Sequence, residues 1–306
     1  MKSSIVVVGS SNTDMVIKTD HLPVPGETIL GGTFFMNAGG KGANQAVAAA
    51  RLGGSITFIG KTGDDIFGRQ AVQSFKEEGI DTTYMVTDRE QPSGVALITV
   101  DKNAENCIVV ASGANATLSK HDIEPALEKI TNATIILMQL ETPLETINYV
   151  ASMASGNNVK VILNPAPACS LPDSLLQNVF ILTPNQTEAA ILSGIEITDL
   201  ASAEAAAQII RSKGVNIVII TLGARGALLV QEDLIQLVSS PIVEAVDSTA
   251  AGDIFNGALA VALAEEKEII CAIRFACKAA AISVTRLGAQ ASAPYRTEVE
   301  ATMVLK

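Results

Sequence analysis

The sequence contains no tryptophan, and aromatic residues make up only 4% of its 306 residues. Proteins that bind single-stranded nucleic acid stack the bases on aromatic side chains, so this scarcity argues against that function. Positive charge is also scarce, because 21 Lys and Arg residues face 32 Asp and Glu residues, giving a net charge of −11. Nucleic acids and anionic membranes are bound by basic surfaces, so the composition argues against both as main partners.

Long apolar runs and metal-binding patterns are missing as well. No apolar run approaches the roughly 18 residues that a membrane-spanning helix needs. The four apolar residues at positions 5–8 are too few for a signal-peptide core and indicate a buried strand. Cys107, Cys169, Cys271 and Cys277 form no C-x-x-C pair, which argues against a zinc site or a disulfide framework. We therefore expect a cytoplasmic protein whose cysteines are small core residues.

Short β-branched runs alternate with alanine-rich stretches of helical spacing. The runs predict buried strands at residues 5–8, 56–59, 134–138, 159–163, 179–182 and 215–221. The stretches between them predict helices at residues 43–52, 66–78, 144–154, 203–213, 257–265 and 269–283. Alternation of this kind predicts an α/β fold, a mostly parallel sheet sandwiched by helices with a Rossmann-like core.

Two segments, at about residues 13–36 and 82–110, break this alternation. They contain strand-like runs without a long helix between neighbours, at residues 15–18, 28–35, 94–100 and 106–110. Such runs predict antiparallel hairpins set apart from the main sheet. No linker, charge run or repeat divides the chain. We therefore predict a single α/β domain over residues 1–306, with a small antiparallel β-lid formed by these two segments.

Two familiar phosphate-binding motifs are absent. Gly60-Lys61-Thr62 resembles the end of a Walker A loop, but the required earlier glycine is replaced by Ser55, and residues 56–59 predict a strand. We interpret this motif as a strand end followed by a turn. The first strand leads into Gly9-Ser10-Ser11-Asn12, which lacks the dinucleotide-binding glycine pattern. A nicotinamide-dependent dehydrogenase is therefore disfavoured.

A better phosphate-site candidate is the stretch Asp247-Ser248-Thr249-Ala250-Ala251-Gly252-Asp253. Its small residues allow backbone amides to approach a ligand. The apolar helix predicted to begin near Phe255 would add unpaired N–H groups and the positive end of its dipole. We predict an anion hole here. Asp253 is then either a helix cap or a base that accepts the proton of an attacking hydroxyl, and the residues alone leave both roles open.

A second glycine-rich segment, Ala38-Gly39-Gly40-Lys41-Gly42-Ala43-Asn44, precedes the helix predicted at residues 43–52. Its glycines would let the backbone approach a ligand, and Asn44 offers both a donor and an acceptor to a hydroxyl. Taken alone, the segment is better explained as a glycine-rich turn before a helix.

Polar residues also follow several predicted strands. They are Asn12 and Asp14, Glu141, Asn185 and Glu188, and the turn at residues 221–226. Each could be a turn or cap residue. Because the carboxyl ends of parallel strands meet at one edge of the sheet, where ligands bind, we expect these groups to lie close together. Their side chains suit neutral hydroxyls, so the sequence predicts a sugar site.

Over essentially its whole length, the sequence resembles the ribokinase-like (PfkB-type) sugar kinase family. Two spaced signatures carry the resemblance: Gly39-Gly40-Lys41-Gly42-Ala43-Asn44-Gln45-Ala46 with Gly53 and Gly63, and Asp247–Asp253 running into Phe255-Asn256-Gly257-Ala258. Residues 10–14, 163–168, 183–188 and 288–290 add to it. The resemblance implies a ribokinase-like fold and ATP-dependent phosphorylation of D-ribose at its 5-hydroxyl.

The resemblance also implies roles for individual residues. Asp253 would be the base, and Ala250, Ala251 and Gly252 would supply the amides of the anion hole. The sugar would be bound by Asn12, Thr13, Asp14, Gly40, Lys41, Gly42, Ala43, Asn44, Glu141 and Asp253. ATP would be bound by Asn185, Glu188, Thr221, Leu222, Gly223, Ala224, Arg225, Gly226, Gly252, Asp253 and Cys277.

Two cations and one protein partner follow from the same resemblance. Magnesium would accompany ATP, with Glu188 helping to organise it. Potassium would act as an activator, held by Asp247, Thr249, Ser283, Arg286, Gly288 and Ser292. The hairpins of the lid would leave open strand edges, so we expect a homodimer formed through the lid.

Other interpretations stay open at this stage. The chain could be a deoxyribokinase or another sugar or nucleoside kinase of the family, or a non-catalytic sugar-binding regulatory protein. Two positions depart from the family pattern: Cys277 lies where relatives often carry Asn or His, and Ile254 lies where a smaller residue is usual. Arg51 and Arg69 have no assigned role and are expected at the surface.

Overall fold

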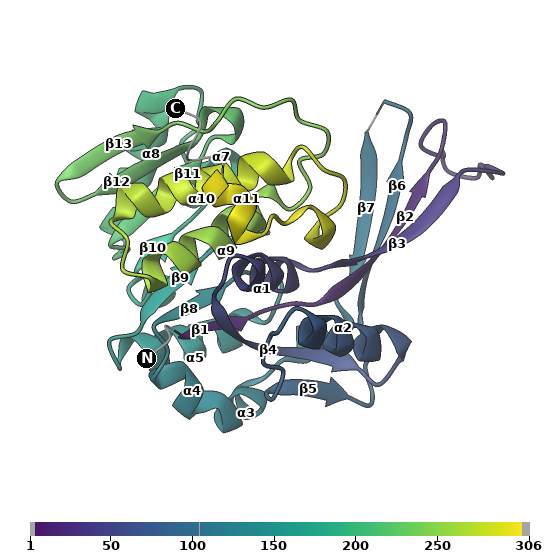
Figure 1. The fold of residues 1–306 in the computed structure, drawn as a ribbon, viewed down its shortest axis with the longest axis horizontal. Coiled ribbons are helices and arrows are strands. Elements are labelled where there is room, and N and C mark those ends of the chain that lie inside the picture. Colours follow the sequence, from purple (N-terminus) through teal and green to yellow (C-terminus); the bar gives the residue numbers. More distant parts are fainter. Residues whose placement is uncertain (1–3, 104, 302–306) are drawn as a thin grey trace.

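Nine strands form the main sheet, in the order β13-β12-β11-β10-β9-β8-β1-β4-β5 (Figure 1). The computed structural model describes residues 4–103 and 105–301. The strands are β1 (Ser4–Val8), β4 (Ser55–Gly63), β5 (Met85–Asp88), β8 (Ile135–Met138), β9 (Lys160–Leu163), β10 (Ile181–Leu182), β11 (Ile217–Thr221), β12 (Ala227–Gln231) and β13 (Leu234–Val238). Neighbours from β5 to β11 are parallel, and β12 and β13 add an antiparallel hairpin at one edge. The prediction of a mostly parallel sheet is confirmed.

Helices cover both faces of this sheet. Successive side chains of a strand point to opposite faces, so Ile5 and Val7 of β1 enter one apolar core while Val6 and Val8 enter the other. Burial on both sides explains why the strand is an uninterrupted apolar run. The first core includes side chains from α1 (Lys41–Arg51), α2 (Ile66–Glu77), α9 (Ala251–Ala264), α10 (Ile269–Ser283) and α11 (Arg296–Ala301). The second includes side chains from α3 (Lys120–Ile123), α4 (Leu127–Thr131), α5 (Leu144–Ser155), α6 (Asp173–Leu176), α7 (Gln186–Ser193) and α8 (Leu200–Ser212).

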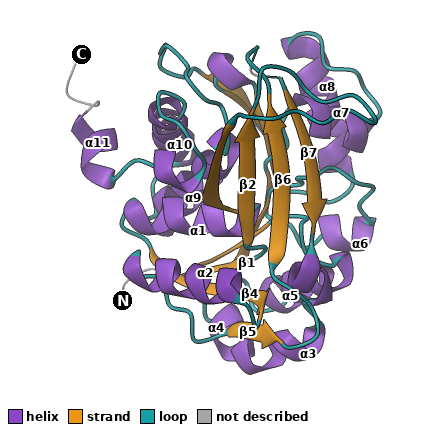
Figure 2. Ribbon diagram, turned by 90° about the vertical axis from the view of Figure 1, so that its right-hand side faces the viewer, coloured by secondary structure: helices purple, strands orange, loops and turns teal. Residues whose placement is uncertain are grey.

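A second, four-stranded sheet stands beside the main body and forms the lid (Figures 1 and 2). Its strands are β3 (Thr33–Gly39), β2 (Asn12–Lys18), β6 (Gly94–Val100) and β7 (Asn106–Ala111), in that order. β3 pairs with β2 and β7 with β6 in the antiparallel sense that the hairpins predicted. The central pairing of β2 with β6 is parallel, because the two hairpins leave the body in the same direction.

The bounds of the lid differ from the prediction in two places. Residues 82–93 were assigned to it, but β5 lies there and pairs with β4 of the main sheet. The strand predicted at residues 28–35 begins at Thr33, since Gly31 and Gly32 both have positive φ and precede the regular ladder. Single-sequence patterning could not tell an edge strand of the main sheet from a lid strand.

Helix α10 was predicted with its observed bounds, whereas α9 begins at Ala251, six residues before the predicted start. The first turn of α9 contains small and charged residues, so it lacks the apolar spacing that marks a helix. Asp253 consequently lies within the first turn and is not the cap; Ala250 is the N-cap residue.

Two expectations about single side chains were wrong. Cys277 is buried, but Cys107, Cys169 and Cys271 are exposed, so only one of the four cysteines is a core residue. Arg51 is largely buried: it pairs with Glu78 and donates to the carbonyl oxygens of Gln290 and Ala293 at 2.8 and 3.0 Å. A surface position for Arg69 is confirmed, with 68% of its side chain exposed.

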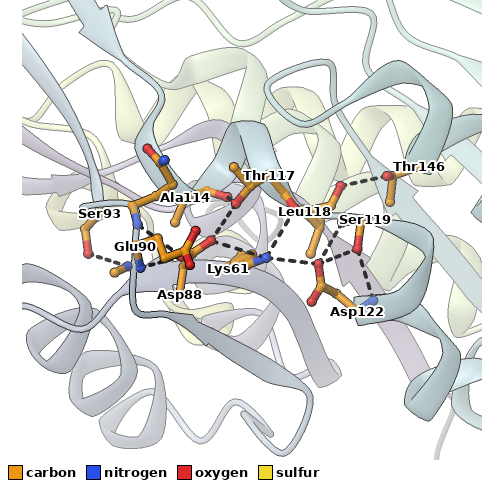
Figure 3. Close-up of polar contacts among 12 residues, drawn as sticks. Lys61, Asp88, Glu90, Ser93, Ala114, Thr117, Leu118, Ser119, Asp122 and Thr146 are labelled. Atoms are coloured by element: carbon orange, nitrogen blue, oxygen red, sulfur yellow. Dashed lines mark hydrogen bonds and ion pairs between the residues drawn. The ribbon is translucent and has the colours of Figure 1, made fainter.

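Lys61 lies inside β4 and joins the main body to the stem of the lid (Figure 3). Its Nζ forms ion pairs with Asp88 at 3.3 Å and Asp122 at 3.2 Å, and it donates to the carbonyl oxygen of Thr117. Asp88 is the last residue of β5 and precedes β6, and Thr117 follows β7. Lys61 therefore contacts the segment that leads into the β6–β7 hairpin and the segment that leaves it. The charge of Lys61 is thus used within the protein, and its motif is not a phosphate-binding loop.

Within residues 4–103 and 105–301, no helix is both long enough and apolar enough to cross a bilayer.

Candidate active site

Glu141 joins three segments at the carboxyl edge of the main sheet. It follows β8, and its Oε2 accepts the backbone N–H of Lys41 at 2.9 Å and the hydroxyl of Ser10 at 2.5 Å. A carboxylate is favoured there because Lys41 opens α1, whose first N–H groups have no partner within the helix. Gly42 is required because a Cβ there would lie 2.6 Å from the backbone nitrogen of Ser10. The glycine-rich segment is therefore locked against the ends of β1 and β8.

Asp253 is held in the first turn of α9, with only 5% of its surface exposed. Asn44 Nδ2 donates to its Oδ2 at 2.9 Å, and Gln45 Nε2 donates to its Oδ1 at 3.0 Å. Burial raises the pKa of Asp253 above its usual range, although the Lys41 charge and the two amides oppose that rise. A carboxylate whose pKa is raised binds a proton more strongly than a solvated one and is suited to act as a base.

Four carboxylates surround the ammonium group of Lys41. Burial alone would lower the pKa of Lys41, but Asp253, Glu141, Glu188 and Asp14 together raise it. The lysine is therefore charged at neutral pH. Among the charged groups that shift the pKa values of Asp14, Glu188 and Asp253, Lys41 is the one cation.

Asp14 extends from β2 of the lid toward the same group. Burial first, and then the charges of Glu141 and Asp253, raise the pKa of Asp14 to about 6. Asn12, two residues earlier, is fixed by Asn115, whose Nδ2 donates to the Asn12 Oδ1 at 2.8 Å. Asn12 and Glu141 line a cavity of about 450 Å³ beneath β7 of the lid. Polar groups from the lid and from the main sheet therefore meet in one place.

The start of α9 is the anion-hole candidate. Ala250 has a left-handed backbone with φ of 59°, a strained conformation for a residue other than glycine. Ala251 donates its N–H back to the Ser248 carbonyl, while Gly252 and Asp253 belong to the first turn, whose amides have no acceptor within the helix. A cavity of about 170 Å³ opens here, lined by Lys41, Asn164, Ala166, Thr183, Asn185, Glu188, Thr221, Ser248, Ala250, Ala251, Gly252, Asp253 and Asn256.

Asn185 and Glu188 form a reciprocal cap at the start of α7. The Asn185 Oδ1 accepts the N–H of Glu188, and the Glu188 Oε2 accepts the N–H of Asn185, both at 2.8 Å. Both side chains also line the cavity next to Asp253, so the cap and the predicted ligand roles are compatible.

A second cavity, of about 300 Å³, continues from the first, because Thr221 and Gly252 line both. Its walls are mainly apolar and include Phe255, Cys277 and Val284. Burial raises the pKa of Cys277 to about 12, so this thiol is not a nucleophile at neutral pH. The two cavities together form one site, with mainly apolar walls at one end and the first turn of α9 at the other.

Comparison with known proteins agrees with this arrangement. The sequence pattern described as pfkB family carbohydrate kinase matches residues 2–296.

The chain belongs to the pfkB family.

Among its relatives, the ribokinase of Haemophilus influenzae is 47% identical over 298 residues, which are 97% of each chain. A deoxyribokinase of Salmonella typhi is 38% identical over 291 residues, 95% of each chain. The structure of Arabidopsis thaliana ribokinase complexed with ribose and ATP superimposes with a TM-score of 0.93 at 33% identity, and the match covers both chains completely. The ribokinase-like fold is thereby shown.

The structure separates several of the residues to which the pfkB resemblance gave roles. Thr13 alternates with Asn12 and Asp14 along β2, and it lines a cavity against α2 that Asn12 also lines and that does not include Glu141. Ala43, in α1, is fully buried in the core, and Leu222 is buried and does not line the cavity of about 300 Å³. Arg225 is exposed and also lies outside that lining. The other residues named for ATP all line the two connected cavities: Asn185, Glu188, Thr221, Gly223, Ala224, Gly226, Gly252, Asp253 and Cys277. Of those named for the sugar, Asn12, Lys41, Glu141 and Asp253 line cavities at the carboxyl edge of the main sheet.

Other contributors were missed by the sequence analysis. Ser10 and Asn115 hold Glu141 and Asn12, and Gln45 holds Asp253. The cavity of about 300 Å³ also takes residues from the loop before α9, namely Ser240, Pro241, Ile242, Val243 and Ala245. Gln45 belongs to a quoted signature and could have been suspected, but nothing in the sequence pairs Asn115 with Asn12.

Three of the residues named for potassium, Asp247, Thr249 and Gly288, are in contact just before the start of α9. Asp247 accepts the N–H of Thr249 and the N–H of Gly288, both at 2.9 Å, which brings the two loops together. Arg286 is turned outward into an ion pair with Glu298, so its side chain is not available and only its carbonyl could contribute. The donors here are hard oxygens, which suits an alkali cation.

Proposed function

We propose that this chain is an ATP-dependent kinase that phosphorylates D-ribose at its 5-hydroxyl. The observation that carries the proposal is the position of Asp253. It lines the cavity of about 170 Å³ at the start of α9 and is hydrogen-bonded to Asn44 of the glycine-rich segment at residues 38–44. A buried carboxylate between an acceptor site and a triphosphate site is what a phosphoryl transfer to a hydroxyl requires. The relatives named above, including the one complexed with ribose and ATP, support the choice of substrate.

Several unused hydrogen-bonding groups fit a sugar. Both contacts of Glu141 use Oε2, which leaves Oε1 to accept a hydroxyl. Asn44 Oδ1 is buried and has no hydrogen-bond partner among the described residues. A buried acceptor without a partner costs about 1–3 kcal/mol, so a ligand hydroxyl that supplies the missing donor is favoured. We assign these atoms, together with Asp14, Asn12, Gly40 and Lys41, to the sugar.

The transfer itself needs positioning and charge stabilisation more than covalent chemistry. Asp253 accepts the proton of the 5-hydroxyl as the oxygen attacks the γ-phosphorus of ATP, while the bond from that phosphorus to the β–γ bridging oxygen breaks and ADP leaves. The first-turn amides of α9, at Gly252 and Asp253, and the Lys41 ammonium stabilise the negative charge on the transferred group. The lid sheet covers the sugar and excludes water, which prevents simple hydrolysis of ATP.

Two cations belong to the proposal. Within the described residues no cluster of three or more His, Cys, Asp or Glu could hold a metal ion. Magnesium that arrives with a nucleotide needs only one or two protein carboxylates, so Glu188 suits it. When bound, magnesium would neutralise part of the negative charge of the phosphates. Potassium would order the start of α9 without touching substrate. It would be held by Asp247, Thr249, Ser283, Arg286, Gly288 and Ser292.

We also propose a homodimer formed through the lid. Apolar side chains of the lid sheet are exposed to solvent, with exposed fractions between 43% and 64%: Ile17, Phe34, Met36, Leu97, Ile108, Val109 and Val110. Burial of such a surface against a second copy is the usual outcome for a sheet with open faces and edges. Light scattering should give twice the 31.8 kDa mass of the chain. A monomer at micromolar concentration contradicts the dimer.

A coupled assay of ADP release tests the substrate. D-ribose, 2-deoxyribose, fructose and adenosine are each supplied with magnesium-ATP and potassium. We expect the highest kcat/KM with D-ribose. Preference for 2-deoxyribose would favour the deoxyribokinase alternative and would discard only the contacts assigned to the 2-hydroxyl. Binding of ribose without turnover of any sugar would favour a regulatory sugar-binding protein.

A further inference from the structure

Two glutamines form a buried chain of amides that ends on Asp253. Gln45 is fully buried in α1, and Gln139, which follows β8, is 1% exposed. Gln139 Nε2 donates to Gln45 Oε1 at 2.6 Å, and Gln45 Nε2 donates to Asp253 Oδ1 at 3.0 Å. Resting on the proposed kinase function, we propose that Gln45 and Gln139 are positioning residues that hold the Asp253 carboxylate in the orientation that accepts the hydroxyl proton.

The direction of the Gln45 amide is fixed by all of its partners at once. Its Nε2 has two hydrogens, and these serve Asp253 Oδ1 and Asn164 Oδ1, the latter at 3.1 Å. Its Oε1 accepts from Gln139. A reversed amide would place an oxygen against two oxygens and an NH₂ against an NH₂, so the arrangement works in one direction only. Gln139 thus completes, with Asn164, the set of contacts in which a donor of Gln45 faces the carboxylate.

The same chain returns to the helix that carries Asp253. Asn164 Nδ2 donates to the carbonyl of Thr183, Thr183 Oγ1 donates to Asn256 Oδ1 at 2.6 Å, and Asn256 Nδ2 donates to the carbonyl of Gly252 at 2.8 Å. Carboxylate and anion-hole backbone are therefore held by one network. Gly9 leaves room for it, because a Cβ at residue 9 would collide with the Gln139 amide.

The charges around Asp253 make neutral donors important. Lys41 of α1 favours the ionised carboxylate, whereas Glu141 after β8, Asp14 of β2 and Glu188 of α7 oppose it. The Asn44 and Gln45 amides supply the other favourable contacts. Asn44 is also assigned to the sugar, but Gln45 has no exposed surface. A change at Gln45 therefore affects the carboxylate without removing a sugar contact.

The test compares wild type with Gln45→Met, which keeps the length of the side chain and lacks its donor. The pH dependence of kcat is measured with ATP and whichever of the four sugars turns over fastest. We expect the acidic limb to move to higher pH by about one unit, since a lost hydrogen bond to a charged group has an effect of that order. Activity should recover as the pH rises, and KM for the sugar should stay within about threefold of wild type.

Gln139→Met should move the limb in the same direction by a smaller amount. Thr146→Val is the matched control, because Thr146 is buried and donates at 2.7 Å to the carbonyl of Leu118, away from Asp253. It should lower stability and leave the limb in place. An unmoved limb in both glutamine variants, or a loss of kcat that is equal at every pH, overturns the proposal.

A second measurement does not depend on the substrate. A double-mutant cycle of Gln45→Met with Asp253→Asn, read as the free energy of unfolding in urea, measures the coupling between the two side chains. We expect the coupling to grow as the pH rises and Asp253 ionises. If it does, while wild type fails to phosphorylate ribose, the positioning role stands and the ribose assignment fails. Zero coupling at every pH overturns the positioning role.

Discussion

Asn44 Nδ2 and Asp253 Oδ2 lie 2.9 Å apart, although 209 residues separate them in the chain. This hydrogen bond joins the start of α1, which follows the glycine-rich segment, to the start of α9, which carries the anion hole. The two segments quoted as family signatures are therefore one site in space. Because Asn44 Oδ1 is buried without a hydrogen-bond partner, we expect occupation of the proposed sugar site to influence the placement of the carboxylate.

Replacement of Lys61 by methionine should destabilise the protein and leave ATP binding unchanged. Lys61 is 13% exposed and lies between Asp88 and Asp122, so its loss leaves two carboxylates without their shared cation. Removal of one partner from a largely buried ion pair costs roughly 1–3 kcal/mol here, less than at a fully buried site. Urea unfolding measures the loss, and KM for ATP should match wild type. A large rise in that KM would revive the phosphate-loop interpretation of residues 60–62.

Asp14→Asn should stabilise the protein at alkaline pH while weakening the sugar site. Since the pKa of Asp14 is raised to about 6, its ionisation opposes folding above that pH. The asparagine variant should gain about 1–3 kcal/mol in the free energy of unfolding near pH 8. The gain should shrink as the pH falls from about 6 to about 4, where wild-type Asp14 becomes protonated.

Urea unfolding at several pH values measures that gain, with the exposed Asp233→Asn as control. A constant difference between Asp14→Asn and wild type at every pH contradicts the account of its burial. An unchanged KM for ribose would remove Asp14 from the sugar site.

The core and the order of its strands and helices could be predicted because buried elements have a regular pattern of apolar residues. Residues 5–8 are apolar without interruption since both faces of β1 are covered, and α10 has a complete apolar stripe. The start of α9 could not be predicted from such a pattern, because Gly252 and Asp253 in its first turn have no apolar side chains.

Site residues that follow a strand could be predicted because parallel strands place their carboxyl ends at one edge. Asn185, Glu188 and Glu141 follow strands, and the structure places all three beside cavities at this edge. Residues that hydrogen-bond to these side chains from distant parts of the sequence could not be predicted. Ser10 and Glu141 are 131 residues apart, and Asn12 and Asn115 are 103 apart, so only the folded chain brings each pair together. Arg51 was placed at the surface for the same reason, as its acceptors come from residues 290 and 293.

Replacement of potassium by sodium should lower kcat, and Asp247→Asn should remove most of that difference. Asp247 ties the loops at Thr249 and Gly288 next to the anion hole, so a cation held there would order the amides of α9. The pKa of Asp247 is lowered: burial would raise it, but hydrogen bonds from Thr249 and Gly288 prevail. The carboxylate is therefore ionised across the assay range. Rates in matched potassium and sodium chloride check this, and equal rates for wild type would contradict the cation site.

The most direct test of the account is Asp253→Asn, measured for ribose binding by calorimetry and for turnover by ADP release. The asparagine keeps the shape of the side chain but cannot accept the proton of the 5-hydroxyl. We predict that ribose still binds within about tenfold of wild type, and that kcat falls by about 10²–10⁴-fold, the range expected for loss of a general base. Turnover near the wild-type rate, with ribose bound, would contradict the central role of this carboxylate.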